Sequence, residues 1–269
     1  MEEKLHDLRT ILSRLGPTLV AFSGGVDSSF LLAVAAEVLR NQIVALMTVS
    51  SSTPPEDAEQ ARILADVLKV PLLIIPHDEL AMPEYAANPT NRCYFCKNSL
   101  YDICQREAQR LSFRAIADGV NLDDLSDYRP GLQAAAEYSV VHPLVEACFS
   151  KAEIRATSKL LGLPTWEKPA SPCLSSRVPY GTPITARMLS QIARAESFIR
   201  AQGFQELRVR HHGTTARIEI RKEDFAHLSV ATVEAMQHEL KDYGFPSSVL
   251  DMEGYRSGVF NEGLGNNDK

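Results

Sequence analysis

The sequence has few features of a secreted, membrane-spanning or nucleic-acid-binding protein. Its five cysteines are too few, and odd in number, for a disulfide framework. No uninterrupted apolar run approaches the roughly 18 residues that span a bilayer, and the N-terminus carries acids where a signal peptide would be basic. Acidic residues outnumber basic ones by 34 to 28, which gives a net charge of −6 and argues against a general nucleic-acid binder. We therefore expect a cytoplasmic protein that binds neither membrane nor nucleic acid.

Apolar strands alternate with amphipathic helices in the first half of the chain. We expect strands at 18–22, 43–49, 71–75 and 113–117, and helices at 28–39, 55–68, 91–111 and 151–161. Near-continuous apolar strands in β-α-β-α order are typical of a parallel sheet that is covered on both faces. The predicted fold class is therefore α/β, with a doubly wound parallel sheet.

The composition changes near residue 168, where a loop rich in proline and serine begins. Beyond this loop the pattern predicts a small α+β unit. Its expected helices are 185–201 and 223–240, and its expected strands are 207–211, 217–220 and 248–251. We therefore predict two domains, 1–168 and 169–269, in a chain of 269 residues.

A loop typical of phosphate binding follows the first predicted strand directly and opens the next helix. It consists of Ser23, Gly24, Gly25, Val26, Asp27 and Ser28. A helix N-terminus offers unpaired N–H groups and partial positive charge, and glycines let the backbone close on a phosphate. The sequence has neither the Gly-Lys-Ser/Thr of a Walker loop nor the Gly-x-Gly-x-x-Gly of a dinucleotide site. The plainer alternative is a turn that merely caps the helix.

Three cysteines are candidates for chemistry. Cys93 and Cys96 are three residues apart at the start of a predicted helix, so both thiols face one side, and a helix N-terminus favours the thiolate. Cys173 lies in the proline- and serine-rich loop. The trio is compatible with a zinc site, a Cys93–Cys96 redox disulfide, a [4Fe–4S] cluster with one open iron, or Cys173 acting as nucleophile or sulfur donor by itself. Three thiolates without an evident fourth ligand favour the cluster. Cys104 and Cys148 are expected in the core, and His142 is expected to be structural.

One stretch of this acidic chain is basic. Between Arg187 and Lys222 there are eight Lys or Arg residues and three Glu, a local balance of +5. Arg208 and Arg210 share one face of a predicted strand because side chains alternate with a period of two. Guanidinium groups suit phosphate, so this face is a candidate for a phosphate-bearing substrate. The alternative is a solvated sheet face with cross-strand ion pairs.

Several motifs, taken in order along nearly the whole chain, resemble the LarE family of ATP-dependent sulfur transferases in the PP-loop ATP pyrophosphatase superfamily. They are the phosphate loop, Arg92-Cys93-Tyr94-Phe95-Cys96-Lys97, Asp127-Tyr128-Arg129-Pro130-Gly131-Leu132, Ala170 to Arg177 with Pro179-Tyr180-Gly181, and Arg208-Val209-Arg210. The resemblance implies adenylation of a carboxylate of pyridinium-3,5-biscarboxylic acid mononucleotide and its conversion to a thiocarboxylate, a step of nickel-pincer nucleotide biosynthesis.

The resemblance also assigns roles to individual residues. ATP pyrophosphate would lie on Ser23, Gly24, Gly25, Asp27 and Ser28, with Asp27 on Mg²⁺, and the substrate phosphate on Ser176, Arg177, Arg208 and Arg210. Cys93, Cys96 and Cys173 would form the sulfur site, and Lys97 is a candidate acid–base group. One branch of the family sacrifices a cysteine's own sulfur, and another holds an iron–sulfur cluster on three cysteines that receives sulfide. Here Pro172 occupies the sacrificial position, and the Cys-x-x-Cys pair is present. These departures favour the cluster branch. A homo-oligomer is expected from the family.

Other functions share the same loop. Amidotransferase-type ligases use it, but they would leave the three cysteines without a task. A tRNA-thiolating enzyme would share the loop and a cysteine-bound cluster for sulfur delivery. The net charge of −6 argues against the RNA-binding surface that such an enzyme needs. A non-catalytic nucleotide sensor is the remaining alternative.

Overall fold

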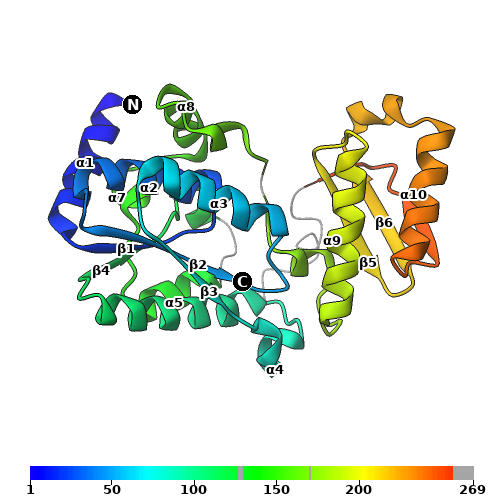
Figure 1. Ribbon diagram of the computed structural model, residues 1–269, viewed down its shortest axis with the longest axis horizontal. Coiled ribbons are helices and arrows are strands. Elements are labelled where there is room, and N and C mark those ends of the chain that lie inside the picture. The colour runs from blue at the N-terminus through cyan, green and yellow to red at the C-terminus, as the bar shows by residue number, and fades with distance from the viewer. Residues whose placement is uncertain (127–129, 170, 257–269) are drawn as a thin grey trace. The chain divides into compact units, whose positions relative to one another are not determined.

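The computed structural model describes residues 1–126, 130–169 and 171–256, and the chain divides into two compact units (Figure 1). The first unit comprises Met1–Asp78 and Asn91–Ser171; the second comprises Glu79–Thr90 and the described residues from Pro172 onward. The motif residues 127–129 and Ala170, and the polar tail from 261, lie outside the described residues. That residues 1–168 and 169–269 form two domains remains a prediction.

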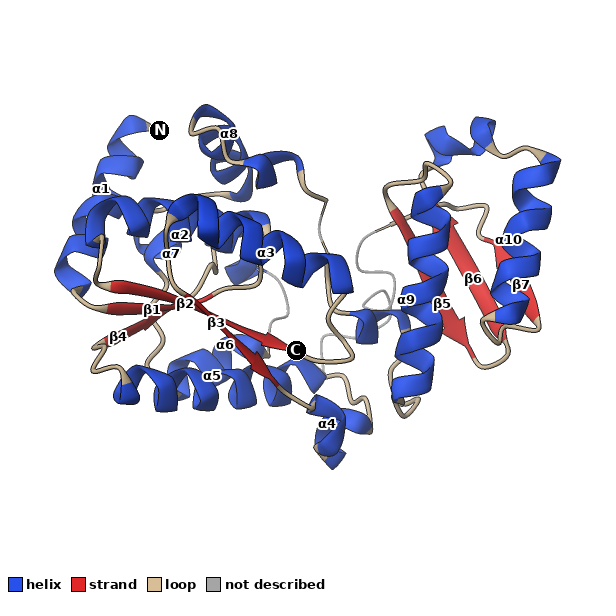
Figure 2. Ribbon diagram, viewed as in Figure 1, coloured by secondary structure: helices blue, strands red, loops and turns tan. Residues whose placement is uncertain are grey.

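The first unit contains a parallel sheet with helices on both faces (Figure 2). Its strands are β1 (Thr18–Ala21), β2 (Ile43–Val49), β3 (Leu72–Pro76) and β4 (Ala115–Ala117), in the order β3-β2-β1-β4. All pairings are parallel, with Thr18 opposite both Ile43 and Ala115. Every residue of β1 is buried, as expected of a central strand covered on both sides. The predicted α/β fold is confirmed.

Two apolar cores lie on the two faces of this sheet. One is formed with the helices α1 (Glu2–Leu15), α2 (Val26–Leu39), α3 (Pro55–Leu68), α7 (Pro143–Glu146) and α8 (Lys151–Leu160). The other is formed with α5 (Arg92–Arg110) and α6 (Gly131–Glu137). In the described ranges no helix is long and apolar enough to cross a membrane.

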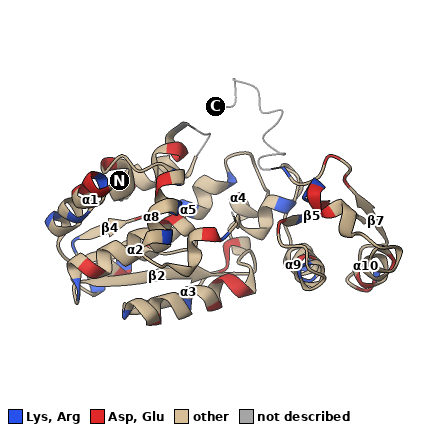
Figure 3. Cartoon of the chain, turned by 90° about the horizontal axis from the view of Figure 1, so that it is seen from above, with Lys and Arg blue, Asp and Glu red and all other residues tan. Residues whose placement is uncertain are grey.

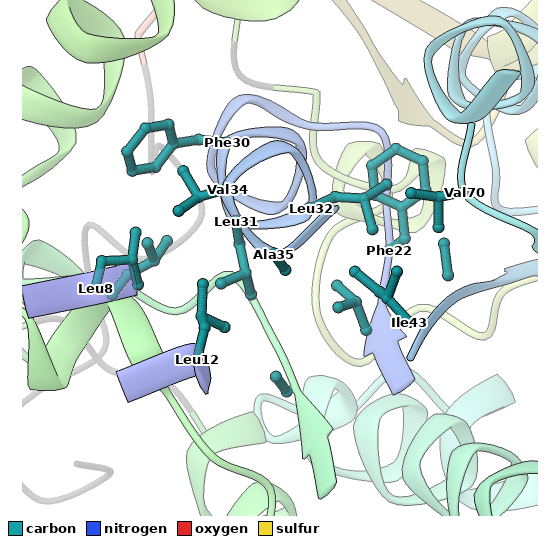
Figure 4. Packing of buried hydrophobic residues seen from close by; sticks show 14 of the residues in the cluster. Leu8, Leu12, Phe22, Phe30, Leu31, Leu32, Val34, Ala35, Ile43 and Val70 are labelled. Atoms are coloured by element: carbon teal, nitrogen blue, oxygen red, sulfur yellow. The ribbon is translucent and has the colours of Figure 1, made fainter. Parts of the chain in front are cut away.

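Helix α2 is the centre of the first core, and its first turn contains the last residues of the phosphate loop. Figure 4 shows Leu31 and Val34 facing the side of α1 that carries Leu8 and Leu12, while Leu32 points towards Val70. These α2 residues are at most 1% exposed. Because α2 is apolar on nearly all sides, packing fixes its axis, and its N-terminus is held rigidly at the carboxyl end of β1.

The second unit contains a three-stranded sheet with two helices. Its strands are β5 (Leu207–His212), β6 (Thr215–Ile220) and β7 (Ser247–Leu250), and its helices are α9 (Ala186–Ala201) and α10 (Val230–Asp242). Strands β5 and β6 pair antiparallel, and β6 and β7 pair parallel. Short elements complete both units: η1 (Glu79–Ala81), α4 (Pro83–Ala86), η2 (Leu122–Ser126), η3 (Pro164–Glu167), η4 (Leu174–Arg177) and η5 (Lys222–His227).

The predicted helix 223–240 is wrong at its beginning. Residues Lys222–His227 form the short 3₁₀ segment η5, and α10 starts at Val230. The break lies at Ser229, whose hydroxyl accepts a hydrogen bond from the Thr232 backbone N–H at 3.0 Å. Serine competes well for this capping position, and it therefore starts a new helix where the apolar pattern alone suggested continuity.

Candidate active site

The phosphate loop of the first unit is closed by its own serines. The Ser23 and Ser28 hydroxyl oxygens lie 3.1 Å apart, and the Ser28 hydroxyl also donates to the Gly25 carbonyl at 3.3 Å. Gly25 is the residue before the first turn of α2, in extended conformation. The loop therefore presents the first N–H groups of α2 from a fixed position, which is the arrangement that binds phosphate at a helix N-terminus.

Two glycines are required by close packing around this loop. Gly24 has φ +68°, and a Cβ there would lie 3.1 Å from the Cβ of Ala61 in α3. Gly119 follows Asp118 at the end of β4, and a Cβ there would lie only 2.7 Å from the backbone nitrogen of Ser28. The segment after β4 therefore rests directly on the first turn of α2, as neighbouring parallel strands require.

Asp27 lies in the first turn of α2 and carries an unsatisfied oxygen. Its Oδ2 lies 3.4 Å from Nζ of Lys151, but its Oδ1 is buried without a hydrogen-bond partner among the described residues. Burial, and then the nearby charge of Asp124, raise the pKa of Asp27, although Lys151 opposes this shift. A buried carboxylate oxygen with no donor suits a hard cation such as Mg²⁺.

Lys168 brings a positive charge to the phosphate loop from a distant part of the sequence. Its Nζ lies 2.8 Å from Oδ1 of Asp57 and donates to the Gly24 carbonyl at 3.1 Å. The same Asp57 accepts a hydrogen bond from the Ser171 hydroxyl at 2.9 Å. An ammonium group has three donors, so this geometry leaves one to point elsewhere. Lys168 thereby supplies the cation that the loop itself does not contain.

A hydrogen-bonded cluster surrounds Asp118 at the end of β4. Its carboxylate accepts from the Tyr101 hydroxyl at 2.6 Å and lies 2.7 Å from Nδ1 of His142. Burial alone would raise the pKa of Asp118, but the hydrogen bond with His142 and the charge of Lys97 lower it. The Lys97 ammonium also lies 5.3 Å from the centre of the Tyr101 ring. Lys97, the predicted acid–base group, therefore faces a buried carboxylate and a phenol.

The structure places the Cys-x-x-Cys pair as predicted, on the first turns of a helix. Cys93 is exposed and Cys96 half-buried near the start of α5, which begins at Arg92. None of the five cysteines, all of them within the described ranges, forms a disulfide. Cys104 is buried in the core as predicted, and burial raises its pKa to about 12, so it stays a thiol. Cys148 is exposed, which corrects the expectation that it lies in the core.

Cys173 belongs to the second unit, where it immediately precedes η4 and is half-buried. Within each unit, the described residues contain no group of three or more His, Cys, Asp or Glu side chains arranged to hold a metal ion. Two hydrogen bonds fix the backbone of Cys173: its carbonyl accepts from the Ser176 N–H at 3.0 Å and from the Arg177 guanidinium at 3.1 Å.

Two buried ion pairs lie in the second unit, one that reaches into the basic stretch from Arg177 and one within it. Arg177 contacts Glu196 with 2.8 Å hydrogen bonds to both carboxylate oxygens, and Arg210 contacts Glu219 at 3.0 and 3.1 Å. Figure 3 shows basic and acidic segments next to each other around β5. Burial, and then the positive charge of Arg177, lower the pKa of Arg208 to about 10. The surroundings of Arg208 therefore make its charged form less stable than that of an exposed arginine.

Sequence reasoning locates the phosphate loop and the helix that carries the cysteine pair, but it misses three partners. Sequence patterns place Lys168 in a loop, Asp57 on a helix face and Asp118 at the end of a strand. The signal available in the sequence is weak: each is a charged residue next to the end of a strand or helix, where α/β folds gather their sites. Arg177 is expected on substrate phosphate, whereas its guanidinium contacts Glu196 and groups of the Cys173 loop, all in the second unit.

Comparison with known proteins agrees with this geometry. The profile of the NAD synthase family matches residues 11–90, which contain the phosphate loop. The chain is 35% identical to the pyridinium-3,5-bisthiocarboxylic acid mononucleotide synthase of Lactiplantibacillus plantarum over 97% of this chain and 95% of that protein. It is 45% identical to an uncharacterized protein of Synechocystis, over 98% and 99% of the two chains. An uncharacterized protein of Methanocaldococcus jannaschii is 29% identical over 89% and 90%.

The match to the bacterial synthase extends over nearly the full length of both proteins and therefore covers both units of this chain. The matched NAD synthase region places the loop in the PP-loop superfamily. The chain belongs to the LarE family of ATP-dependent sulfur transferases, within the PP-loop ATP pyrophosphatases.

Proposed function

We propose that this chain uses ATP to convert a carboxylate of pyridinium-3,5-biscarboxylic acid mononucleotide into a thiocarboxylate, in the synthesis of the nickel-pincer nucleotide. The observation that carries the proposal is the full-length similarity to a synthase of the corresponding bisthiocarboxylic acid mononucleotide. The phosphate loop supports it, because the geometry at the start of α2 suits the pyrophosphate of ATP.

The first half-reaction is adenylation of the substrate. A carboxylate oxygen attacks the α-phosphorus of ATP, the bond from this phosphorus to the pyrophosphate oxygen breaks, and an acyl-adenylate and pyrophosphate form. Ser23, Gly24, Gly25 and Ser28 hold the departing pyrophosphate, and the N–H groups of α2 stabilise its growing charge. Lys168, hydrogen-bonded to the Gly24 carbonyl, adds a positive charge beside them.

Mg²⁺ is the cation expected with ATP, and Asp27 fits it. The buried, unpartnered Oδ1 of Asp27 offers an oxygen ligand, and the raised pKa indicates that the site disfavours an unneutralised carboxylate. A bound divalent cation would relieve this cost. Asp27 would hold the cation, which neutralises phosphate charge when bound.

The substrate's own phosphate is proposed to lie at the arginines of β5. Arg208 is the central residue of this assignment. The positive charges of Arg177 and Arg210 lower its pKa, and the negative charge of a bound phosphate would offset this repulsion. Arg210 donates to the Ser176 carbonyl at 2.9 Å, so Ser176 and Arg210 belong to the same corner of the second unit. Arg177 is left out of this proposed phosphate site, because its guanidinium is occupied by Glu196 and by the carbonyls of Pro172 and Cys173.

The second half-reaction delivers sulfur. A sulfide nucleophile attacks the acyl carbon of the adenylate, the bond to the AMP oxygen breaks, and a thiocarboxylate and AMP result after loss of the sulfide proton. We propose that Cys93, Cys96 and Cys173 would hold a [4Fe–4S] cluster, which supplies an open iron position for sulfide. The available thiols support this. Cys93 and Cys96 lie on one face of α5, Cys173 lies in the loop before η4, and none of the three forms a disulfide. In the alternative, Cys173 itself gives up its sulfur.

The reaction is tested by mixing the full chain with Mg·ATP, the biscarboxylic mononucleotide and sulfide under anaerobic conditions. We expect AMP and pyrophosphate in equal amounts and a product in which one carboxylate oxygen is replaced by sulfur, detected by mass spectrometry. A pyridinium mononucleotide without carboxylates is the matched control and should release no AMP. Release of ADP and phosphate, or AMP release that ignores the carboxylates, contradicts the proposal.

The sulfur source needs a separate measurement on the same preparation. With a cluster, anaerobic protein contains iron and acid-labile sulfide at about four each per chain and absorbs broadly around 400 nm, and the protein mass is unchanged after turnover. Colourless protein that turns over once and loses one H₂S from Cys173, leaving dehydroalanine, excludes the cluster. Size-exclusion chromatography on this preparation tests the expected homo-oligomer.

A further inference from the structure

The backbone that carries Cys173 is tied to a buried arginine. Nη1 of Arg177 donates to the carbonyl of Pro172 at 2.6 Å and to the carbonyl of Cys173 at 3.1 Å. It also contacts the Ser176 hydroxyl at 3.0 Å. The Arg177 side chain is fully buried, so water does not compete for these hydrogen bonds. A single guanidinium therefore holds both peptide carbonyls that flank the Cys173 residue.

The other side of this guanidinium is fixed by Glu196, which is 1% exposed in α9. Its carboxylate accepts from Nε and Nη2 of Arg177 at 2.8 Å each, and also from the Val209 backbone N–H in β5 at 3.0 Å. Burial would raise the pKa of Glu196, but the charge of Arg177 lowers it. Arg177 thus connects the Cys173 loop to the rigid helix and sheet of the second unit.

A buried ion pair is a weak explanation for stability alone, because removing two charges from water costs about as much as their attraction returns. In other proteins, hydrophobic residues of similar volume often replace a buried ion pair with little loss of stability. What a hydrophobic pair lacks is the planar fork that meets two carbonyls and a carboxylate at once. The choice of ionic residues here is therefore better explained by orientation of the loop than by folding energy.

We infer that Arg177 and Glu196 are positioning residues for sulfur transfer: they fix the main chain at Cys173 and thereby the direction of its thiol. This inference rests on the proposed function, in which Cys173 takes part in sulfur delivery. It also moves Arg177 away from direct phosphate binding, since the carbonyls of Pro172 and Cys173 occupy Nη1. Misplacement of a reacting group by about 1 Å costs on the order of a hundredfold in rate.

The central variant replaces both partners, Arg177→Met with Glu196→Leu, so that no unpaired buried charge remains between them. We expect this double variant to melt lower than wild type, because the buried Val209 N–H loses its acceptor. Its carboxylate-dependent exchange of pyrophosphate into ATP, which reports adenylation, should be retained at saturating mononucleotide. Thiocarboxylate formation should fall by about a hundredfold. Arg177→Lys keeps the charge but cannot bridge the carbonyls, so it should show the same selective loss. Thiocarboxylate formation at the wild-type rate in either variant overturns the inference.

Arg200→Met is the matched control. Arg200 contacts the same carboxylate, with Nη2 3.1 Å from Oε2 of Glu196, from a half-exposed position one turn further along α9. The substitution therefore removes a partner of Glu196 but leaves in place the guanidinium of Arg177 that meets the two loop carbonyls. This variant should retain thiocarboxylate formation within about twofold. An equal loss in Arg200→Met would mean that the ion-pair network acts only through general stability, and the positioning role would then be wrong.

A second readout does not depend on the substrate. After any bound iron is removed by chelation, the rate of Cys173 alkylation by iodoacetamide is compared with that of the exposed Cys148 in the same sample. Release of the loop should raise the Cys173 rate severalfold in the double variant and in Arg177→Lys, and leave Cys148 unchanged. If the wild type releases no AMP with the mononucleotide, the proposed function fails, and this readout still decides the positioning role: equal Cys173 rates overturn it.

Discussion

The sharpest test of the phosphate loop is a single methyl group at Gly119. In Gly119→Ala the new Cβ would lie 2.7 Å from the Ser28 nitrogen, 2.9 Å from the Ser28 Cα and 3.0 Å from the carbonyl carbon of Asp27. All three are backbone atoms in the first turn of α2. A flexible side chain could move aside, but this backbone is fixed by the packing of α2 in the core.

The size of the effect follows from the clash. Relief to an ordinary contact requires a shift of about 0.7 Å in the first turn of α2 or in the segment after β4. Overpacking of this kind costs about 1–3 kcal/mol of stability. The displaced N–H groups are those that we propose to face the phosphate, and a hydrogen bond to a charged group contributes about 1.5–3 kcal/mol. Loss of one such bond weakens ATP binding by roughly 10- to 100-fold.

The assay is calorimetric titration of the full chain with a non-hydrolysable Mg·ATP analogue, with thermal unfolding measured in parallel. Gly162→Ala is the matched control, because Gly162 has φ +68° and, beyond its chain neighbours, no atom of the described residues lies within 4 Å of the place a methyl group would take. It should lose about 1 kcal/mol of stability and bind the analogue normally. Wild-type affinity in Gly119→Ala, or an equal loss of affinity in Gly162→Ala, would refute the reasoning.

The shifted pKa values give three further predictions. The raised pKa of Asp27 means that its stabilising contribution is lost as the pH rises through the folded-state pKa. Asp27→Asn should therefore melt no lower than wild type at pH 7, yet it should lose Mg·ATP turnover. The control Asp66→Asn, at an exposed residue of α3, should keep this turnover. Because its pKa is lowered in the folded state, Asp118 stabilises the fold at any pH above its pKa in the unfolded chain. Asp118→Asn should therefore lose about 1.5–3 kcal/mol of unfolding free energy in urea at pH 7. The difference in stability from wild type should vanish as the pH falls through the folded-state pKa. With its pKa near 12, Cys104 should resist iodoacetamide at pH 8 until the chain unfolds, while Cys148 reacts; equal rates would contradict its burial.

The sheet and the phosphate loop could be predicted because their signals are local. Each strand of the first unit is a near-continuous apolar run, and the loop follows β1 and leads into the first turn of α2. The parallel order then follows from the helical crossovers. The position of Cys93 and Cys96 on one helix was predictable for the same reason, since residues three apart share a face.

What could not be predicted depends on contacts between distant segments. Lys168 reaches Asp57 and the Gly24 carbonyl, and His142 reaches Asp118, without any periodic pattern that connects them. The break before α10 depended on one serine competing with an apolar pattern. In each case tertiary geometry decided between roles that the residue type left open.

The basic stretch shows how a charge count can mislead. Its local excess of +5 predicted a face that attracts anions. The structure neutralises much of this charge with partners that include residues outside the stretch. These pairs include Arg210–Glu219, Arg217–Asp251 and Arg221–Asp224. Long-range attraction of a phosphate is correspondingly small, because opposite charges a few ångströms apart cancel at a distance.

The phosphate site that we propose in this unit would therefore depend on short-range geometry. Arg208 is buried next to like charges, so its charged form is costly until an anion arrives. An anion that binds there removes this cost, and its binding free energy adds to the stability of the folded unit. In the proposed reaction, phosphate binding at Arg208 would therefore stabilise β5. The Cys173 loop is connected to the same strand, because Arg177 binds Glu196 and Glu196 accepts from the Val209 N–H of β5.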